Sequence, residues 1–235
     1  MKSSFAIATA IASLAVVSLS LTAPASAHHL WLEVENGAAK IYFGEFGENL
    51  REVSPGSLDK LQPKAKVGDK PVAVEKAANG FAVAGKLGAG ESIVAEDDRY
   101  PLYVRQRDGQ RSIYRPAARF VPDSTPRPAA LELDVVPAGP GKYQVTFKGK
   151  PLPKTKVQVV AQSGWVKEVH TGDDGGIEVV LPWKGPYVLE VHHTDRTAGK
   201  RGEEAYDVIN YVTSLTVLQP QGLEPVPASP AAKPH

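Results

Sequence analysis

Short apolar stretches separated by turn signals constrain the fold of this chain most strongly. Residues 30–35 alternate between apolar and polar side chains, Asn36-Gly37 follows, and residues 40–43 return as a second apolar stretch. Alternation with a period of two is typical of a half-buried strand, and Asn-Gly is a strong hairpin turn. With 21 glycines, 20 prolines and few helical patterns in the chain, this arrangement predicts an all-β fold.

The same pattern continues along most of the chain. Turn signals at Asn79-Gly80 and Asp108-Gly109 separate the next strands, and residues 57–61 favour one helical turn at most. Short strands at this spacing are typical of a β-sandwich. We expect the further strands at residues 72–75, 81–84, 92–95, 102–107, 113–120, 131–136, 143–147, 156–161, 165–170, 177–181, 187–193 and 211–218.

Proline-rich segments predict how the strands are divided between domains. Residues 122–128 hold three prolines and indicate an extended linker, and residues 219–235 are rich in proline and alanine and indicate a disordered tail. The sequence therefore predicts two β-sandwich domains joined by a linker. Their bounds are 28–121 for the N-terminal domain, 122–130 for the linker, 131–218 for the C-terminal domain and 219–235 for the tail.

The first 27 residues have the pattern of a cleaved signal peptide. Lys2 provides the positive start, residues 5–21 form an apolar run, and Ala25-Ser26-Ala27 has the small residues of a cleavage site. A membrane anchor is the competing interpretation, but the run is no longer than the roughly 18 residues that a spanning helix needs. We therefore expect a periplasmic or secreted protein that begins at His28 and does not span a membrane.

Charge and cysteine content exclude several classes of site. The chain has 27 Lys and Arg against 26 Asp and Glu, and loss of Lys2 makes the two numbers equal. A neutral chain lacks the positive surface that nucleic acids bind. There is no cysteine, so neither disulfides nor thiolate metal ligands can form.

Histidines are the candidate functional residues. Of the six in the chain, four form two adjacent pairs, His28-His29 at the expected start and His192-His193 at the end of a predicted strand. Imidazole and amine nitrogens suit nickel, cobalt, copper and zinc. A terminal His28 would add its α-amino group, whose pKa of about 7.7 leaves part of it deprotonated at neutral pH. All four histidines are therefore the predicted metal ligands.

Each of these histidines has a simpler interpretation as well. A processed terminus can be mobile, although burial of Trp31 would hold it in place. On a strand through residues 187–193, His193 shares a face with Leu189, whereas His192 points the other way with Glu190, and either could simply reach solvent. His170 and His235 are interpreted as a strand-end residue and a tail residue without a metal role.

The C-terminal half resembles a known type of module. Residues 149–191 look like a transthyretin-like or carboxypeptidase-regulatory-like β-sandwich, a type that is usually non-catalytic. The features that carry the resemblance are the opening Gly149-Lys150-Pro151-Leu152, the hairpin from Thr171 to Asp174-Gly175, and the strand entry Gly185-Pro186-Tyr187-Val188-Leu189.

The whole expected mature chain resembles the domain-of-unknown-function family 4198. The matching positions are the terminal histidine, the aromatic Trp31 shortly after it, and the late-strand histidine, His192 or His193. This family includes periplasmic components associated with cobalt and nickel transport. The resemblance implies a metal-handling protein that binds or relays nickel or cobalt, with copper as a further option, for a membrane metal-uptake transporter.

Two other functions are compatible with the same sequence. The chain could be a structural or interaction module with no metal role, or a copper enzyme that uses an N-terminal histidine. The sequence has neither the nucleophile-elbow pattern nor the metalloprotease helix motif, so we expect no catalytic residues.

Overall fold

The structure is a computed structural model that describes residues 28–235, so the predicted signal peptide lies outside the described residues. It is all-β, as predicted, with one short 3₁₀ turn. The elements are β1 (His29–Glu35), β2 (Ala38–Glu45), β3 (Leu50–Arg51), η1 (Ser57–Lys60), β4 (Lys64–Val67), β5 (Lys70–Val72), β6 (Val74–Ala77), β7 (Gly80–Val83), β8 (Ile93–Glu96), β9 (Tyr103–Val104), β10 (Arg111–Val121), β11 (Leu133–Gly139), β12 (Lys142–Phe147), β13 (Lys150–Pro151), β14 (Lys156–Ala161), β15 (Val166–His170), β16 (Gly176–Glu178), β17 (Gly185–Asp195), β18 (Gly199–Arg201), β19 (Glu204–Tyr206) and β20 (Val208–Gln219).

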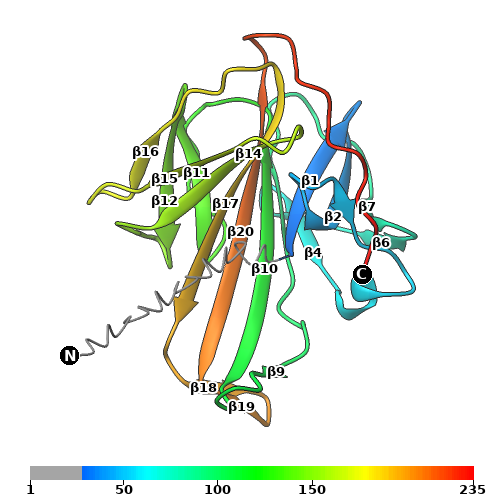
Figure 1. The fold of residues 1–235 in the computed structure, drawn as a ribbon, viewed down its shortest axis with the longest axis vertical. Coiled ribbons are helices and arrows are strands. Elements are labelled where there is room, and N and C mark those ends of the chain that lie inside the picture. Colours follow the sequence, from blue (N-terminus) through cyan, green and yellow to red (C-terminus); the bar gives the residue numbers. More distant parts are fainter. Residues whose placement is uncertain (1–27) are drawn as a thin grey trace, which may run out of the picture.

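A nine-stranded sheet runs through the molecule, in the order β15-β14-β17-β20-β10-β8-β4-β5, with β9 paired to β10. Its long strands β17, β20 and β10 stand side by side in the middle (Figure 1). β10 and β20 pair in parallel, whereas the other neighbours in this sheet pair antiparallel.

Two smaller sheets pack against this long sheet. One has the order β1-β2-β7-β6 with β3 paired to β2, and the other has the order β11-β12-β13 with β16 paired to β12. The hairpin between β1 and β2 turns at the predicted Asn36-Gly37, with φ angles of 51° and 80°. Positive φ at both turn positions is the reason that Asn-Gly suits this hairpin.

The long sheet contributes side chains to two hydrophobic cores, one on each of its faces. On β10, Ile113 and Val121 join the core beneath β11 and β12, whereas Ala118 and Phe120 join the core beneath β1 and β2. Successive residues of a strand point to opposite faces, so one strand contributes to both cores without any change of register.

The predicted domain boundary at 122–130 does not separate two independent sheets. β10 lies before it and β20 after it, yet they pair along their length, from Ser112 opposite Val208 to Val121 opposite Val217. The two predicted strand sets therefore share one continuous sheet. The segment predicted as a linker connects two elements that are both packed onto this sheet.

The last residues run along the outside of the molecule and end beside the η1 loop (Figure 1). Leu223 exchanges backbone hydrogen bonds with Pro182 and Lys184, and the Ser229 amide donates to the Gln162 carbonyl at 3.1 Å. The Asn49 amide group donates to the Ser229 carbonyl at 2.9 Å. The sequence predicts a disordered tail, but here the tail follows the body through single hydrogen bonds. Proline has no backbone N–H, so the prolines of the tail prevent a continuous ladder of backbone hydrogen bonds and leave only isolated ones.

Candidate metal centre

The start of β1 is held by side chains from the long sheet. β1 is an edge strand, so its outward carbonyls need partners from elsewhere. The Ser214 hydroxyl on β20 donates to the Leu30 carbonyl at 2.6 Å, and the Tyr114 hydroxyl on β10 donates to the His28 carbonyl. These two hydrogen bonds fix His28 at a defined position next to the long sheet.

His28 lies in a cluster with Glu52 and His235. Its Nε2 atom is 2.6 Å from Glu52 Oε1, and the backbone amide of His235 donates to Glu52 Oε2 at 3.3 Å. One potential ligand atom from each of these three side chains lies within 4.8 Å of the others. On the other side of the ring, His28 Nδ1 lies 3.6 Å from Glu45 Oε1. Two imidazoles and two carboxylates therefore meet at this point.

The Glu52 carboxylate is the most informative member of this cluster. Its side chain is fully buried, at 0% exposed, and its backbone amide donates to the Phe43 carbonyl at 2.8 Å directly after β3. A buried carboxylate is costly unless it is paired or binds a metal. The imidazole of His28 and the amide of His235 supply hydrogen-bond partners, and a cation would compensate the charge more fully.

His29 lies on the opposite side of β1. Its Nε2 atom is 3.1 Å from Glu190 Oε1 on β17, and its ring packs near Trp31. Adjacent residues of a strand project to opposite faces, so His28 and His29 cannot reach one site from the same extended strand. The structure thus brings His28 to Glu52 and His29 to Glu190.

The other predicted pair is divided in the same way. His193 packs its ring against Phe147 at 4.4 Å on the face of Leu189, and burial lowers its pKa. His192 lies on the face of Glu190, as the alternation predicts. Burial of its ring nitrogens, and then the nearby His29, lower the pKa of His192 to about 4. The four predicted ligands therefore do not form one cluster, and among them only His28 belongs to the cluster with Glu52 and His235.

Sequence reasoning missed Glu52 and set His235 aside. Glu52 stands in a short loop without a ligand motif, and His235 lies in a segment whose composition indicates disorder. Both reach His28 through contacts between residues far apart in the chain, 24 positions for Glu52. No local spacing in the sequence signals this arrangement.

Glu190 is one of the buried groups that make stability depend on pH. Burial, and then the negative charge of Glu45, raise the pKa of Glu190 to about 8 from an ordinary 4.5. Between pH 4.5 and about 8, the Glu190 carboxyl therefore keeps its proton in the folded state but loses it in the unfolded state. The stabilising contribution is full below pH 4.5 and is lost as pH rises through about 8.

We therefore expect Glu190→Gln to flatten the pH dependence of stability. Relative to their difference at pH 5, the variant should gain at least about 1 kcal/mol over the parent protein at pH 9, because one pKa unit corresponds to about 1.4 kcal/mol. Urea unfolding at both pH values measures this difference. Parallel pH profiles for the two proteins would show that Glu190 ionises as easily in the folded state as in the unfolded one.

A larger hollow in the described structure lies away from the cluster. It has a volume of about 710 Å³ and is lined by residues such as Val121, Tyr143 and Leu181, with no histidine in its lining. A smaller hollow of about 480 Å³ borders the His28 cluster. Only the smaller one therefore adjoins the candidate ligands.

Comparison with known proteins gives no relative for this chain. No protein-family model matches it, and neither a curated protein nor a solved structure does. Within residues 28–235, no helix has the length and apolar character needed to cross a membrane. The cluster of His28, Glu52 and His235 is therefore the feature from which a function can be inferred.

Proposed function

We propose that this chain is an exported, periplasmic metal-handling protein that binds a divalent transition metal through His28, Glu52 and His235. Nickel or cobalt is the proposed ion, with copper as a further option. The observation that carries the proposal is the meeting of two imidazoles with a fully buried carboxylate, with ligand atoms within 4.8 Å of one another.

The donor set suits such an ion. Imidazole nitrogens favour nickel, cobalt, copper and zinc over magnesium or calcium, and a carboxylate reduces the net charge of the bound ion. Three protein ligands leave coordination positions open, whereas structural sites are usually closed by four. An incompletely enclosed ion can be passed on, which supports a role in binding or relaying the metal for a membrane uptake transporter.

The orientation of the His28 ring distinguishes two binding modes. A chelate with the terminal α-amino group would use Nδ1, which faces Glu45 at 3.6 Å. Nε2 faces Glu52 at 2.6 Å, on the side of His235. We favour the Nε2 mode because it includes the buried carboxylate, and this mode does not require a free α-amino group.

Calorimetric titration with Ni²⁺ tests the proposal. For the protein that begins at His28, we expect one ion per chain, and His235→Ala or Glu52→Gln should weaken binding by about tenfold or more. Glu52→Gln preserves the size of a buried side chain, and thermal unfolding without metal checks that it still folds. His170→Ala removes an exposed histidine outside the cluster and is the matched control, with unchanged affinity.

A protein with one extra residue before His28 separates the two modes. The Nε2 mode predicts an affinity for Ni²⁺ within about threefold of the parent, because the side-chain ligands stay in place. Loss of binding on extension would favour the α-amino mode, and copper-dependent oxidation of a substrate would then favour the copper-enzyme alternative. Absence of binding in every protein would refute the metal proposal and leave the structural module.

A further inference from the structure

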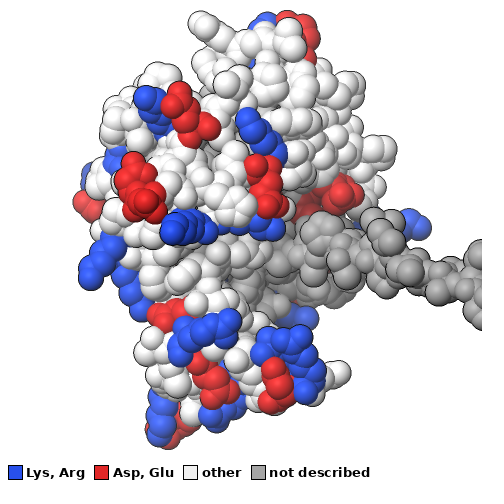
Figure 2. All heavy atoms as spheres, turned by 60° about the vertical axis from the view of Figure 1, so that its left-hand side comes forward, with Lys and Arg blue, Asp and Glu red and all other residues white. Residues whose placement is uncertain are grey.

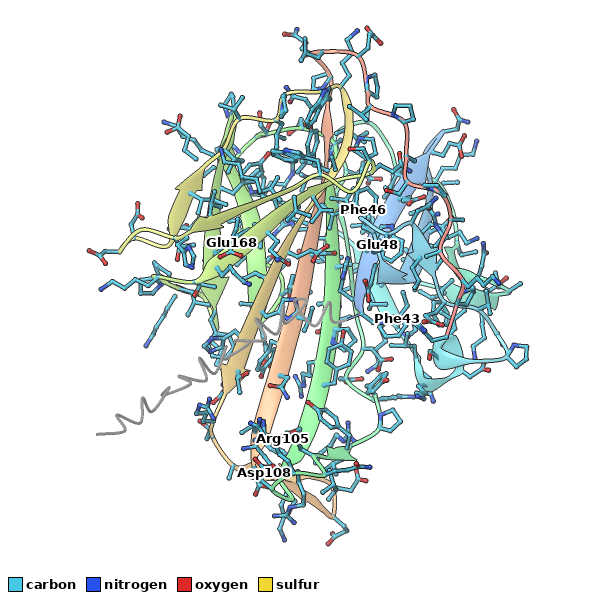
Figure 3. The ribbon with its side chains drawn as sticks, in the orientation of Figure 1. Phe43, Phe46, Glu48, Arg105, Asp108 and Glu168 are labelled. Atoms are coloured by element: carbon cyan, nitrogen blue, oxygen red, sulfur yellow. The ribbon has the colours of Figure 1, made fainter. Side chains whose placement is uncertain are left out.

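An aromatic hollow opens directly beside the cluster. It has a volume of about 480 Å³, and its lining includes two of the three proposed ligands, His28 and His235. The rest of the lining consists of Phe43, Ser57, Tyr100, Tyr103 and Tyr114. Phe43 lies on the β1–β2 side of the long strands, close to the end of the tail (Figure 3).

The hollow is larger than a hydrated ion needs. Six waters at about 30 Å³ each occupy about 180 Å³, less than half of the volume. Hollows of this size with mainly aromatic walls are typical of sites for small organic molecules. The hollow can therefore hold a small organic molecule next to the metal ion.

The walls indicate the chemistry of that occupant. The rings of Tyr100 and Tyr114 meet edge to face with centroids 5.0 Å apart, and such walls favour flat rings. The Tyr103 hydroxyl accepts a hydrogen bond from Asn210 at 2.6 Å, which leaves its own proton available as a donor. Apart from the cluster histidines, the lining residues carry no side chain that is charged at neutral pH, so charge on the occupant must be balanced at the metal.

We propose that the site takes the metal as a complex with a small, flat heteroaromatic carboxylate, which fills the hollow and occupies the open coordination positions. This inference rests on the proposed function, because the chelator is held through the ion. The carboxylate and ring nitrogen of the chelator bind the metal, and its ring lies among Phe43, Tyr100 and Tyr103. The aromatic walls then distinguish such a complex from one with an aliphatic chelator.

The charges of the chain agree with recognition through the metal. In the view of Figure 2, Lys and Arg side chains alternate with Asp and Glu without a broad area of one sign. The whole chain has 27 Lys and Arg against 26 Asp and Glu, and a net charge this close to zero gives little general attraction for an anionic chelator. Binding of the chelator should therefore depend on the ion.

Equilibrium dialysis tests this inference with defined probes. The protein is dialysed against Ni²⁺ alone, against a 1:1 complex of Ni²⁺ with pyridine-2-carboxylate, and against a 1:1 complex with alanine, which offers similar donors without a ring. We expect nickel and pyridine-2-carboxylate to be retained together in equal amounts. The alanine complex should be retained about tenfold more weakly, since aromatic contacts each contribute up to about 1.5 kcal/mol.

Tyr103→Ala separates the hollow from the metal ligands. Tyr103 is 41% exposed and lies in the two-residue strand β9, so its removal should leave the fold intact. We expect three- to tenfold weaker retention of the pyridine-2-carboxylate complex and an unchanged affinity for Ni²⁺ alone. Val104→Ala, the neighbouring exposed residue outside the lining, is the matched control and should change neither.

The failures of the two proposals are distinguishable. Retention of Ni²⁺ without pyridine-2-carboxylate would overturn the chelator inference and leave the metal site standing. Equal retention of the alanine and pyridine complexes, unaffected by Tyr103→Ala, would do the same. If neither Ni²⁺ nor either complex is retained, the proposed function fails and the inference fails with it.

Discussion

Replacing Arg119 with alanine is expected to lower the free energy of unfolding by about 3–5 kcal/mol. Arg119 on β10 is only 3% exposed, and its Nη1 atom donates to Asp134 Oδ2 at 2.7 Å; Asp134 itself is 0% exposed. The same Arg119 nitrogen donates to the Pro128 carbonyl at 3.1 Å. Without the guanidinium, the Asp134 carboxylate stays buried beside two backbone amides but without a counter-charge.

Urea unfolding measures this change, and an exposed pair serves as its control. Arg105 also donates to a carboxylate, that of Asp108 at 2.6 Å, but both of these side chains are exposed, at 39% and 41%. Exposed pairs are worth at most about 1 kcal/mol, so Arg105→Ala should have a small effect. Equal losses in the two variants would contradict the importance of burial for the Arg119 pair.

This buried pair explains why the predicted linker is not a free connection. Asp134 accepts hydrogen bonds from the amides of Ala130 and Leu131 as well as from Arg119. The segment that follows β10 is therefore not free, because the hydrogen bonds of Arg119 and Asp134 hold its last residues to β10. Prolines in a sequence indicate an extended chain, but they do not show whether side chains elsewhere hold that chain to the body.

Local patterns predicted the strands well and their partners poorly. The alternation in residues 30–35 and the turn at Asn36-Gly37 give β1 and its hairpin because both are short-range effects. The parallel pairing of β10 with β20 joins residues almost a hundred positions apart. No short-range pattern identifies such a partner, so the proline-rich segment alone does not show that the strands before and after it share one sheet.

The candidate site likewise depends on contacts between residues far apart in the sequence, which short-range patterns do not identify. Adjacency in the sequence suggested that His28 and His29 act together, but the strand geometry sends them to Glu52 and Glu190. Alternation along a strand predicts the observed opposite faces of His192 and His193, and the same alternation separates His28 from His29. The position of His235 next to His28 depends on the path of residues 219–235. Composition alone does not predict that path.

The second large effect is expected at Trp31, which connects β1 to the long sheet. Its side chain is fully buried and packs with Phe46, Val160 and Val188, and its ring stacks on Tyr42 with centroids 5.4 Å apart. Removal of a buried tryptophan side chain typically lowers the free energy of unfolding by about 3–5 kcal/mol. The protein loses the burial of apolar surface, and a cavity remains where the ring was. We expect Trp31→Ala to lower the free energy of unfolding by this amount.

The same substitution should weaken metal binding although Trp31 touches none of the proposed ligands. His28 is positioned by the start of β1, and loss of the packing between β1 and β17 loosens that start. Trp31→Phe is the matched variant, since it keeps an aromatic ring in the core and loses the hydrogen bond from Nε1 to Glu33 at 3.0 Å. Urea unfolding and Ni²⁺ titration of both variants separate packing from that bond. If Trp31→Ala binds Ni²⁺ as tightly as Trp31→Phe, the site does not depend on β1 being held against the long sheet, and the Tyr114 and Ser214 hydrogen bonds alone suffice to place His28.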